Sequence, residues 1–167
     1  MKYPTSIEIT EVGPRDGLQN QASIVSTDVK VSFIDALSKT GLQRIEVSSF
    51  VNPKWVPQLA DASEVFTTIQ REKNVTYSAL IPNLQGWNRA LEVGVDEIGL
   101  MTAASDSFCE ANINTTISGS IQQIRPLVEV AKSKGIRTRA YVSCVVACPY
   151  EGKMDSQQVR MVVEQLL

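Results

Sequence analysis

The sequence predicts an α/β protein in which helices cover a parallel sheet. Strand patterns and helix patterns alternate strictly along the 167 residues, an order typical of an open, doubly wound sheet or of a closed barrel. The first strand pattern runs into Gly13-Pro14, and no Gly-x-Gly-x-x-Gly turn follows it, which argues against a dinucleotide-binding sheet. Periodicity alone leaves the open sheet and the barrel as alternatives.

The first two units each pair a strand with a helix. The strand pattern 7–12 leads to a helix that Ser26 or Thr27 caps and Gly41 ends. Apolar residues recur on this helix with helical spacing, at Val29, Phe33, Ile34 and Leu37. The second strand pattern is 44–49, and the next helix begins at Asp61, where Glu64 gives a start like a capping box.

The remaining units follow the same order. The third strand, 76–81, precedes a helix that starts at Asn83 with Trp87 and Leu91 facing inward. The fourth strand, 95–101, precedes a long helix over 114–134 that Pro126 is expected to kink. Its apolar stripe consists of Ile117, Ile121, Ile124, Val128 and Ala131. A fifth strand, 137–146, is followed by a helix that begins at Asp155 and carries Val159, Val162, Val163 and Leu166.

Composition excludes several classes of protein. Hydrophobic residues make up 43% and charged residues 20% of the chain, as in ordinary globular domains. The net charge of −2 gives no basic field for nucleic acid or an anionic membrane surface. No apolar run approaches the roughly 18 residues of a membrane span, and Met1-Lys2-Tyr3-Pro4 lacks an apolar targeting segment, so we expect a cytoplasmic protein. Three cysteines cannot all pair, which fits a reducing compartment.

The run from Glu11 to Asn20, EVGPRDGLQN, is the most informative segment. Gly13-Pro14 ends the first strand, so Arg15 and Asp16 are expected on a turn at the strand's carboxyl end. Barrel enzymes keep their catalytic groups at that end of the strands. On residue types alone, a solvated surface ion pair is the alternative.

This run resembles the N-terminal signature of the 3-hydroxy-3-methylglutaryl-CoA (HMG-CoA) lyases, in a barrel superfamily that also contains the isopropylmalate and homocitrate synthases. Gly13-Pro14 and Leu18 distinguish it from the form that the synthases usually carry. Further segments match in the same order, at 25–27, 45–58, 82–84, 141–144 and 148–153. The resemblance implies a TIM (β/α)8 barrel, with residues 1–167 as the N-terminal part of a single catalytic domain. A whole barrel needs about 250 residues, so about the first five βα units are expected here.

The resemblance also implies the reaction and its residues. HMG-CoA lyases cleave (S)-3-hydroxy-3-methylglutaryl-CoA to acetyl-CoA and acetoacetate by a metal-assisted retro-Claisen reaction, in leucine degradation and ketone-body metabolism. Asp16 matches a ligand of the divalent cation, Mg²⁺ or Mn²⁺, and Arg15 matches the group that stabilises the enolate oxygen. Glu46 matches a glutamate that we expect to orient Arg15, although a half-buried strand polar is the alternative.

Four further residues match positions near the substrate. Gln19 and Asn20 could donate to substrate oxygens or be ordinary loop polars. Asn112 and Thr116, at the expected start of the long helix, match positions near the acyl group, but helix starts prefer such residues anyway.

Several features argue against activity of these 167 residues alone. The chain has no histidine, whereas the resemblance implies a His-x-His pair and an asparagine as further metal ligands. Cys144 and Cys148 are a poor zinc motif and are expected to be buried strand residues, distinct from the catalytic cysteine loop of the family. Arg139 lies in an apolar strand and should pair with a carboxylate of a neighbouring strand, such as Glu46.

Three functions therefore remain open from the sequence. The first is the N-terminal portion of an HMG-CoA lyase that binds an acyl-CoA and forms a homo-oligomer, a dimer, when complete. The second is a Claisen-type acyltransferase of the same superfamily, and the third is a non-catalytic truncated relic.

Overall fold

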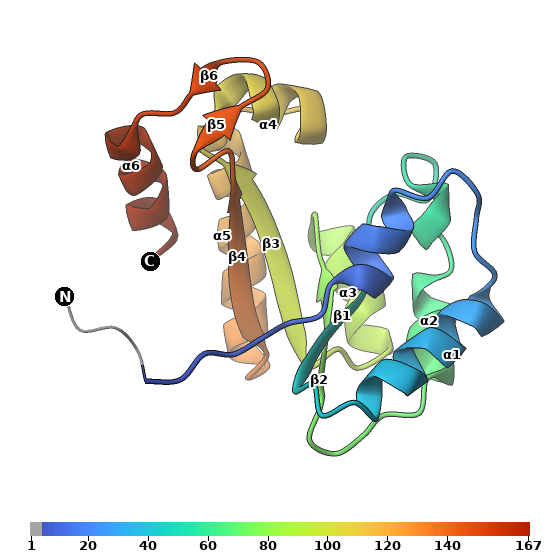
Figure 1. Ribbon diagram of the computed structural model, residues 1–167. Coiled ribbons are helices and arrows are strands. Elements are labelled where there is room, and N and C mark those ends of the chain that lie inside the picture. Colours follow the sequence, from blue (N-terminus) through green and yellow to red (C-terminus); the bar gives the residue numbers. More distant parts are fainter. Residues whose placement is uncertain (1–4) are drawn as a thin grey trace.

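The computed structural model describes residues 5–167 and contains a four-stranded parallel sheet in the order β1-β2-β3-β4 (Figure 1). The strands are β1 (Arg44–Ser49), β2 (Thr76–Leu80), β3 (Glu97–Ala103) and β4 (Arg137–Ser143). Each strand pairs in parallel with the next one along the chain, which is also how consecutive strands are arranged in a β/α barrel. Residues Met1–Pro4, used above for the expected cytoplasmic location, lie outside the described part.

Helices occupy every connection between these strands. They are α1 (Thr27–Ser38) before β1, α2 (Ala62–Thr68) after it, α3 (Leu84–Glu92) after β2, and α4 (Asp106–Ile113) with α5 (Ile117–Ser133) after β3. Beyond β4, a short hairpin of β5 (Ala147–Cys148) and β6 (Gly152–Lys153) leads to α6 (Ser156–Leu166). Within residues 5–167 no helix is long and apolar enough to cross a membrane.

The predicted first strand, 7–12, is not formed as a strand. Only Glu11 pairs with the sheet, through a parallel bridge to Ile45, while Ile7 and Ile9 are 79% and 62% exposed. The alternating apolar pattern predicts a strand along the whole segment, but only one of its residues pairs with the sheet. A strand needs a continuous hydrogen-bond ladder and a covered face. The described residues give this segment neither, so four strands and one bridge replace the five predicted strands.

The predicted long helix, 114–134, is α5, which begins at Ile117, three residues later than predicted, and follows the separate helix α4. Asn114 has a left-handed backbone (φ 51°), which ends α4 and prevents one continuous helix. Ser105 caps α4, a helix that the sequence patterns did not reveal, and Thr116 caps α5. Pro126 lies within α5, and β4 ends at Ser143 rather than at residue 146.

Helix caps show where local signals are sufficient. Asn83 accepts a hydrogen bond from the Gly86 amide at 2.9 Å, and Asp155 caps α6 as predicted. Asp61 stands at the start of α2, but its carboxylate makes no cap bond. It instead accepts from Lys30 Nζ at 2.7 Å and from Thr27 Oγ1 at 2.8 Å, so a residue from another helix has displaced the predicted capping box.

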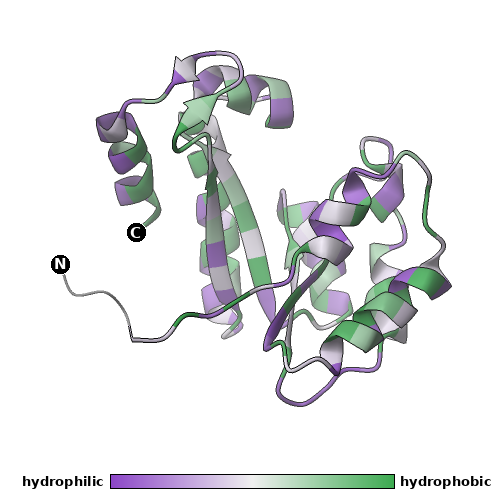
Figure 2. Ribbon diagram, viewed as in Figure 1, coloured by the Kyte–Doolittle hydropathy of each residue, from purple (hydrophilic) through white to green (hydrophobic). Residues whose placement is uncertain are grey.

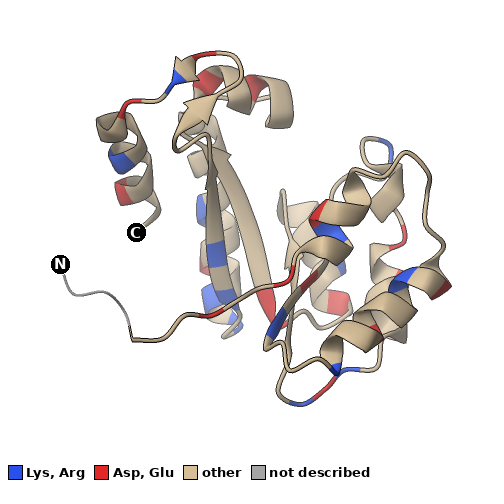
Figure 3. Ribbon diagram, in the orientation of Figure 1, with Lys and Arg blue, Asp and Glu red and all other residues tan. Residues whose placement is uncertain are grey.

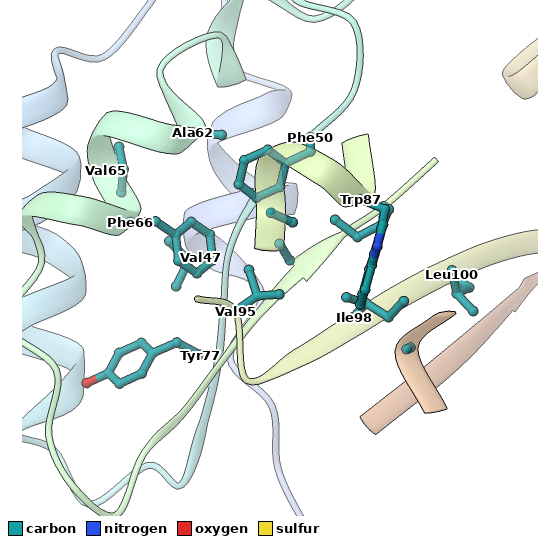
Figure 4. Close-up of a cluster of buried hydrophobic side chains, with 14 of the residues drawn as sticks. Val47, Phe50, Ala62, Val65, Phe66, Tyr77, Trp87, Val95, Ile98 and Leu100 are labelled. Atoms are coloured by element: carbon teal, nitrogen blue, oxygen red, sulfur yellow. The ribbon is translucent and has the colours of Figure 1, made fainter. Parts of the chain in front are cut away.

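The main core fills the space between the outer face of the sheet and the helices (Figure 4). Val47, Tyr77 and Ile98 project from the strands towards Phe66 of α2 and Trp87 of α3. The stripe predicted for α1 is displaced around the helix, whose buried positions are Lys30, Ile34 and Ser38. Val29 and Phe33 are exposed, and the ribbon of α1 carries several hydrophobic segments in Figure 2.

Candidate active site

The segment that carries Arg15 is a five-residue π-helical turn, η1 (Gly13–Gly17). The Asp16 amide donates to the Val12 carbonyl at 2.7 Å, and the Gly13 amide donates to the Glu11 carboxylate at 2.6 Å. These bonds hold the turn next to the bridge between Glu11 and Ile45. Single-turn π segments of this kind occur often at functional sites.

The turn places Arg15 between two carboxylates. Arg15 Nε donates to Glu46 Oε1 at 2.5 Å, and Arg15 Nη1 donates to Asp16 Oδ1 at 2.7 Å. The Glu46 side chain is fully buried, whereas the Asp16 side chain is 55% exposed. The guanidinium is therefore fixed on its inner side by a buried anion, and Asp16 faces solvent.

Glu46, on the edge strand β1, accepts a second hydrogen bond from a residue on the opposite edge strand, β4. The Tyr141 hydroxyl on β4 donates to Glu46 Oε2 at 2.5 Å. Gly99, on β3 next to β4, leaves the necessary room, because a Cβ there would lie 3.0 Å from the Tyr141 ring and 3.2 Å from Glu46 Oε2. Burial, followed by the hydrogen bond to Glu46 and its charge, raises the pKa of Tyr141. Tyr141 is thus a neutral donor at ordinary pH.

A second buried carboxylate, Glu97 at the start of β3, pairs with arginines of β1 and β4. Acidic and basic segments both occur along the sheet in Figure 3. Arg139 Nη2 donates to Glu97 Oε1 at 2.5 Å, and Arg44 donates to the other oxygen. Arg139 also donates to Thr10 Oγ1 at 2.7 Å. The prediction that Arg139 pairs with a neighbouring strand's carboxylate is confirmed, but that carboxylate is Glu97 and not Glu46.

A cleft of about 730 Å³ lies at the carboxyl ends of β1 and β2 and against α3, α4 and α5. Of the residues predicted for the site, Gln19 and Asn112 line it. Arg15, Asp16, Asn20 and Thr116 do not.

Asn20 and Thr116 bond to the backbone nearby. Asn20 Nδ2 donates to the Asp16 carbonyl at 2.8 Å, and Thr116 Oγ1 caps α5 by accepting from Gly119 at 3.1 Å. Asn112 lies in the last turn of α4 rather than at the start of the long helix. The structure therefore brings Arg15, Asp16 and Glu46 together, with Asn20 bonded to the Asp16 backbone, whereas the side chains of Gln19, Asn112 and Thr116 make no hydrogen bond to that group.

Sequence reasoning missed Tyr141, Gly99 and Glu97 as parts of the network. A signal was available on β4, because Arg137, Arg139 and Tyr141 alternate and so share one face of the strand. Three polar side chains on one face of a sheet strand indicate a polar interior, but the carboxylates they meet come from distant strands.

The described residues do not by themselves fit a divalent cation. Mg²⁺ requires about six oxygen ligands in near-octahedral geometry. Across residues 5–167 no group of three or more His, Cys, Asp or Glu side chains could hold a metal ion, and Asp16 offers one carboxylate.

The cysteines form no disulfide in the described chain. Cys109 and Cys148 are buried, and Cys148 lies in β5, as predicted. Cys144 is only half-buried and follows β4 with a left-handed backbone (φ 60°), so the prediction that it is a buried strand residue is wrong. Burial and the neighbouring Cys148 raise the pKa of Cys144 to about 11. Hydrogen bonds from Ser105 and nearby backbone amides outweigh burial and lower the pKa of Cys148.

These features define a class of protein: a β/α-barrel domain in which an arginine on the turn after the first strand segment is held by a buried glutamate of β1. The comparisons agree. Residues 6–167 match the HMGL-like family. The chain belongs to this family.

Curated relatives carry lyase names. The chain is 46% identical over 166 residues to the 3-hydroxy-3-isohexenylglutaryl-CoA/hydroxy-methylglutaryl-CoA lyase of Pseudomonas aeruginosa, covering 99% of this chain and 55% of the relative. It is 48% identical over 163 residues to the cytoplasmic 3-hydroxy-3-methylglutaryl-CoA lyase of Homo sapiens, covering 98% of this chain and 44% of the relative. The chain thus spans about half the length of these relatives.

Solved structures confirm the fold class. The HMG-CoA lyase of Bacillus subtilis superimposes with a TM-score of 0.95 at 44% identity, covering 99% of this chain and 56% of that one. The HMG-CoA lyase of Acinetobacter baumannii, solved with coenzyme A and 3-methylmalate, has a TM-score of 0.90 at 40% identity, covering 95% of this chain and 52% of that one. The described sheet is therefore part of a TIM barrel.

Proposed function

We propose that residues 1–167 belong to a single catalytic domain that cleaves (S)-3-hydroxy-3-methylglutaryl-CoA to acetyl-CoA and acetoacetate. The observation that carries this proposal is the Arg15 guanidinium, fixed at 2.5 Å by a fully buried Glu46. Names of relatives that share 46–48% of their aligned residues with this chain support the substrate.

Arg15 is proposed to stabilise the charge that develops during bond cleavage. When the tertiary hydroxyl of the substrate loses its proton, the C–C bond breaks and negative charge moves to the thioester oxygen. A cation that is already oriented stabilises this oxyanion more than it stabilises the ground state, which raises the rate of the chemical step. Glu46 and Asp16 hold the guanidinium from two sides, so little reorganisation is required.

Glu46 is proposed as a positioning residue rather than as the base. Both of its oxygens already accept hydrogen bonds, one from Arg15 and one from Tyr141. A carboxylate engaged in this way is poorly placed to take a proton from the substrate. Tyr141 is proposed to act indirectly, because its hydroxyl holds the Glu46 carboxylate, which in turn orients Arg15.

Asp16 is proposed as one ligand of a Mg²⁺ or Mn²⁺ ion. Its half-exposed carboxylate has the hard oxygen that such ions prefer, and none of the steps above depends on the ion. Gln19 and Asn112 are proposed to contact the substrate because they line the cleft. Asn20 and Thr116 are proposed to act indirectly, by shaping the turn and the start of α5.

The proposal extends to the protein's setting. An acyl-CoA is the proposed partner, a homodimer the proposed assembly, and leucine degradation in the cytoplasm the proposed context. Relatives are named from both the cytoplasm and mitochondria.

The proposal is tested by assaying acetoacetate release from HMG-CoA with the natural protein and with Arg15→Met and Arg15→Lys. Loss of an oxyanion-stabilising donor should lower kcat by about 10²–10³. Arg15→Lys keeps the charge and should recover part of kcat, whereas a rise in KM with an unchanged kcat would make Arg15 a binding group. Condensation of acetyl-CoA with a keto acid, and no cleavage, would favour the acyltransferase. Absence of both activities would favour the non-catalytic alternative.

A further inference from the structure

The cleft carries one charge. Of the described residues that line it, Arg89 is the single ionisable side chain, and no carboxylate lines the cleft. The remaining polar lining consists of amides and hydroxyls, among them Asn52, Asn83 and Gln85. A cleft with a cation and no acid attracts an anionic group.

Arg89 is held in place without being neutralised. It lies in the last turn of α3, is partly buried, and its guanidinium stands over the Phe50 ring at 5.3 Å from the ring centroid. Within residues 5–167 no carboxylate lies within 4.0 Å of it, whereas Arg15, Arg44 and Arg139 each pair with at least one. A cation–π contact orients a guanidinium while its N–H groups remain available to a ligand.

The other lining groups indicate a large, partly flat ligand. Trp55 lines the cleft and is 73% exposed, so its ring is available for stacking. Asn83 Oδ1 already accepts from the Gly86 amide, which leaves its NH₂ group to donate. Gln19, at the end of the Arg15 turn, also lines the cleft and connects it to that turn.

We infer that Arg89 is the subsite for a phosphate group of an acyl-CoA. The inference rests on the proposed function, which places the reacting acyl group at Arg15. Since Arg15 does not line the cleft, the cleft suits the rest of the substrate, whose charged groups are phosphates. Arginine is the side chain best matched to phosphate oxygens, because its planar N–H groups can donate two parallel hydrogen bonds.

Calorimetric titration of the natural protein with CoA and with pantetheine, which has no phosphate, tests this assignment. Arg89→Gln should raise the dissociation constant for CoA about tenfold, the effect of about 1.4 kcal/mol, and leave that for pantetheine unchanged. Arg89→Lys keeps the charge but loses the planar fork, so its affinity for CoA should fall between the two. Titration with 3′-dephospho-CoA then identifies which phosphate Arg89 contacts.

Arg125→Gln is the matched control. Arg125 is exposed on α5 and does not line the cleft, so removing its charge should leave CoA affinity unchanged. An unchanged CoA affinity in Arg89→Gln, or an equal loss for pantetheine, would overturn the assignment while the proposed function stands. A wild-type protein that binds neither ligand would contradict both. Competition by micromolar inorganic phosphate would identify a site for free phosphate instead.

Discussion

Removing the Tyr141 hydroxyl tests the buried network most directly. Tyr141→Phe deletes the donor to Glu46 Oε2 but leaves the ring in contact with Gly99. Glu46 is fully buried, so its oxygen cannot recover a water molecule in exchange without opening the site. A hydrogen bond to a charged partner contributes about 1.5–3 kcal/mol to stability, and we expect the free energy of unfolding to fall by about 2 kcal/mol.

Tyr77→Phe is the matched comparison. The Tyr77 hydroxyl donates to Ser38 Oγ at 2.9 Å and accepts from the Glu72 amide at 2.8 Å, and both partners are neutral. A neutral hydrogen bond contributes about 1 kcal/mol, and Tyr77→Phe removes two of them, so this variant should also lose about 2 kcal/mol, or about half as much stability per hydrogen bond as Tyr141→Phe. Urea unfolding of both variants measures the losses. A loss for Tyr141→Phe of half that for Tyr77→Phe, or less, would show that the hydroxyl contributes no more to Glu46 than one neutral hydrogen bond.

Three further predictions concern single positions. Asp16→Asn should weaken Mn²⁺ binding in calorimetry and lower activity together, while thermal unfolding stays unchanged; an unaltered affinity would remove Asp16 from the ligands. Gly99→Ala should lower kcat more than KM rises, because its Cβ would press on Tyr141 and Glu46 and displace Arg15, whereas wild-type kinetics would show that the network can yield. Cys144 should stay a thiol until the pH approaches its pKa of about 11, since burial raises that pKa and only the thiolate reacts. Its alkylation by iodoacetamide, followed by mass spectrometry, should still be accelerating above pH 9, and a plateau below that pH would contradict the shift.

Local signals in the sequence predicted most of the fold. The sheet strands after the first, the caps at Asn83 and Asp155, and the turn bearing Arg15 follow from patterns that span ten residues or fewer. Those features depend on neighbours along the chain, so the sequence alone contains their physical cause.

Long-range contacts account for what was not predicted. The Asp61 carboxylate does not cap α2 because it pairs with the buried ammonium group of Lys30, 31 residues away. Glu46 meets Tyr141 across 95 residues, and Glu97 meets Arg44 across 53. The break between α4 and α5 depends on one left-handed backbone at Asn114. Asparagine adopts this conformation only occasionally, so its presence in the sequence does not predict the break.

The single bridge between Glu11 and Ile45 links the stability of the N-terminal segment to ligand binding. Two backbone hydrogen bonds, from Glu11 to the Arg44 carbonyl and from Glu46 to the Glu11 carbonyl, attach this segment to the sheet. Amide protons held by so few bonds exchange through local opening, at a free-energy cost far below that of global unfolding. Because Arg15 follows the bridge by four residues, a ligand that binds Arg15 must also slow deuterium uptake at Glu11 and Glu46, even though it contacts neither amide.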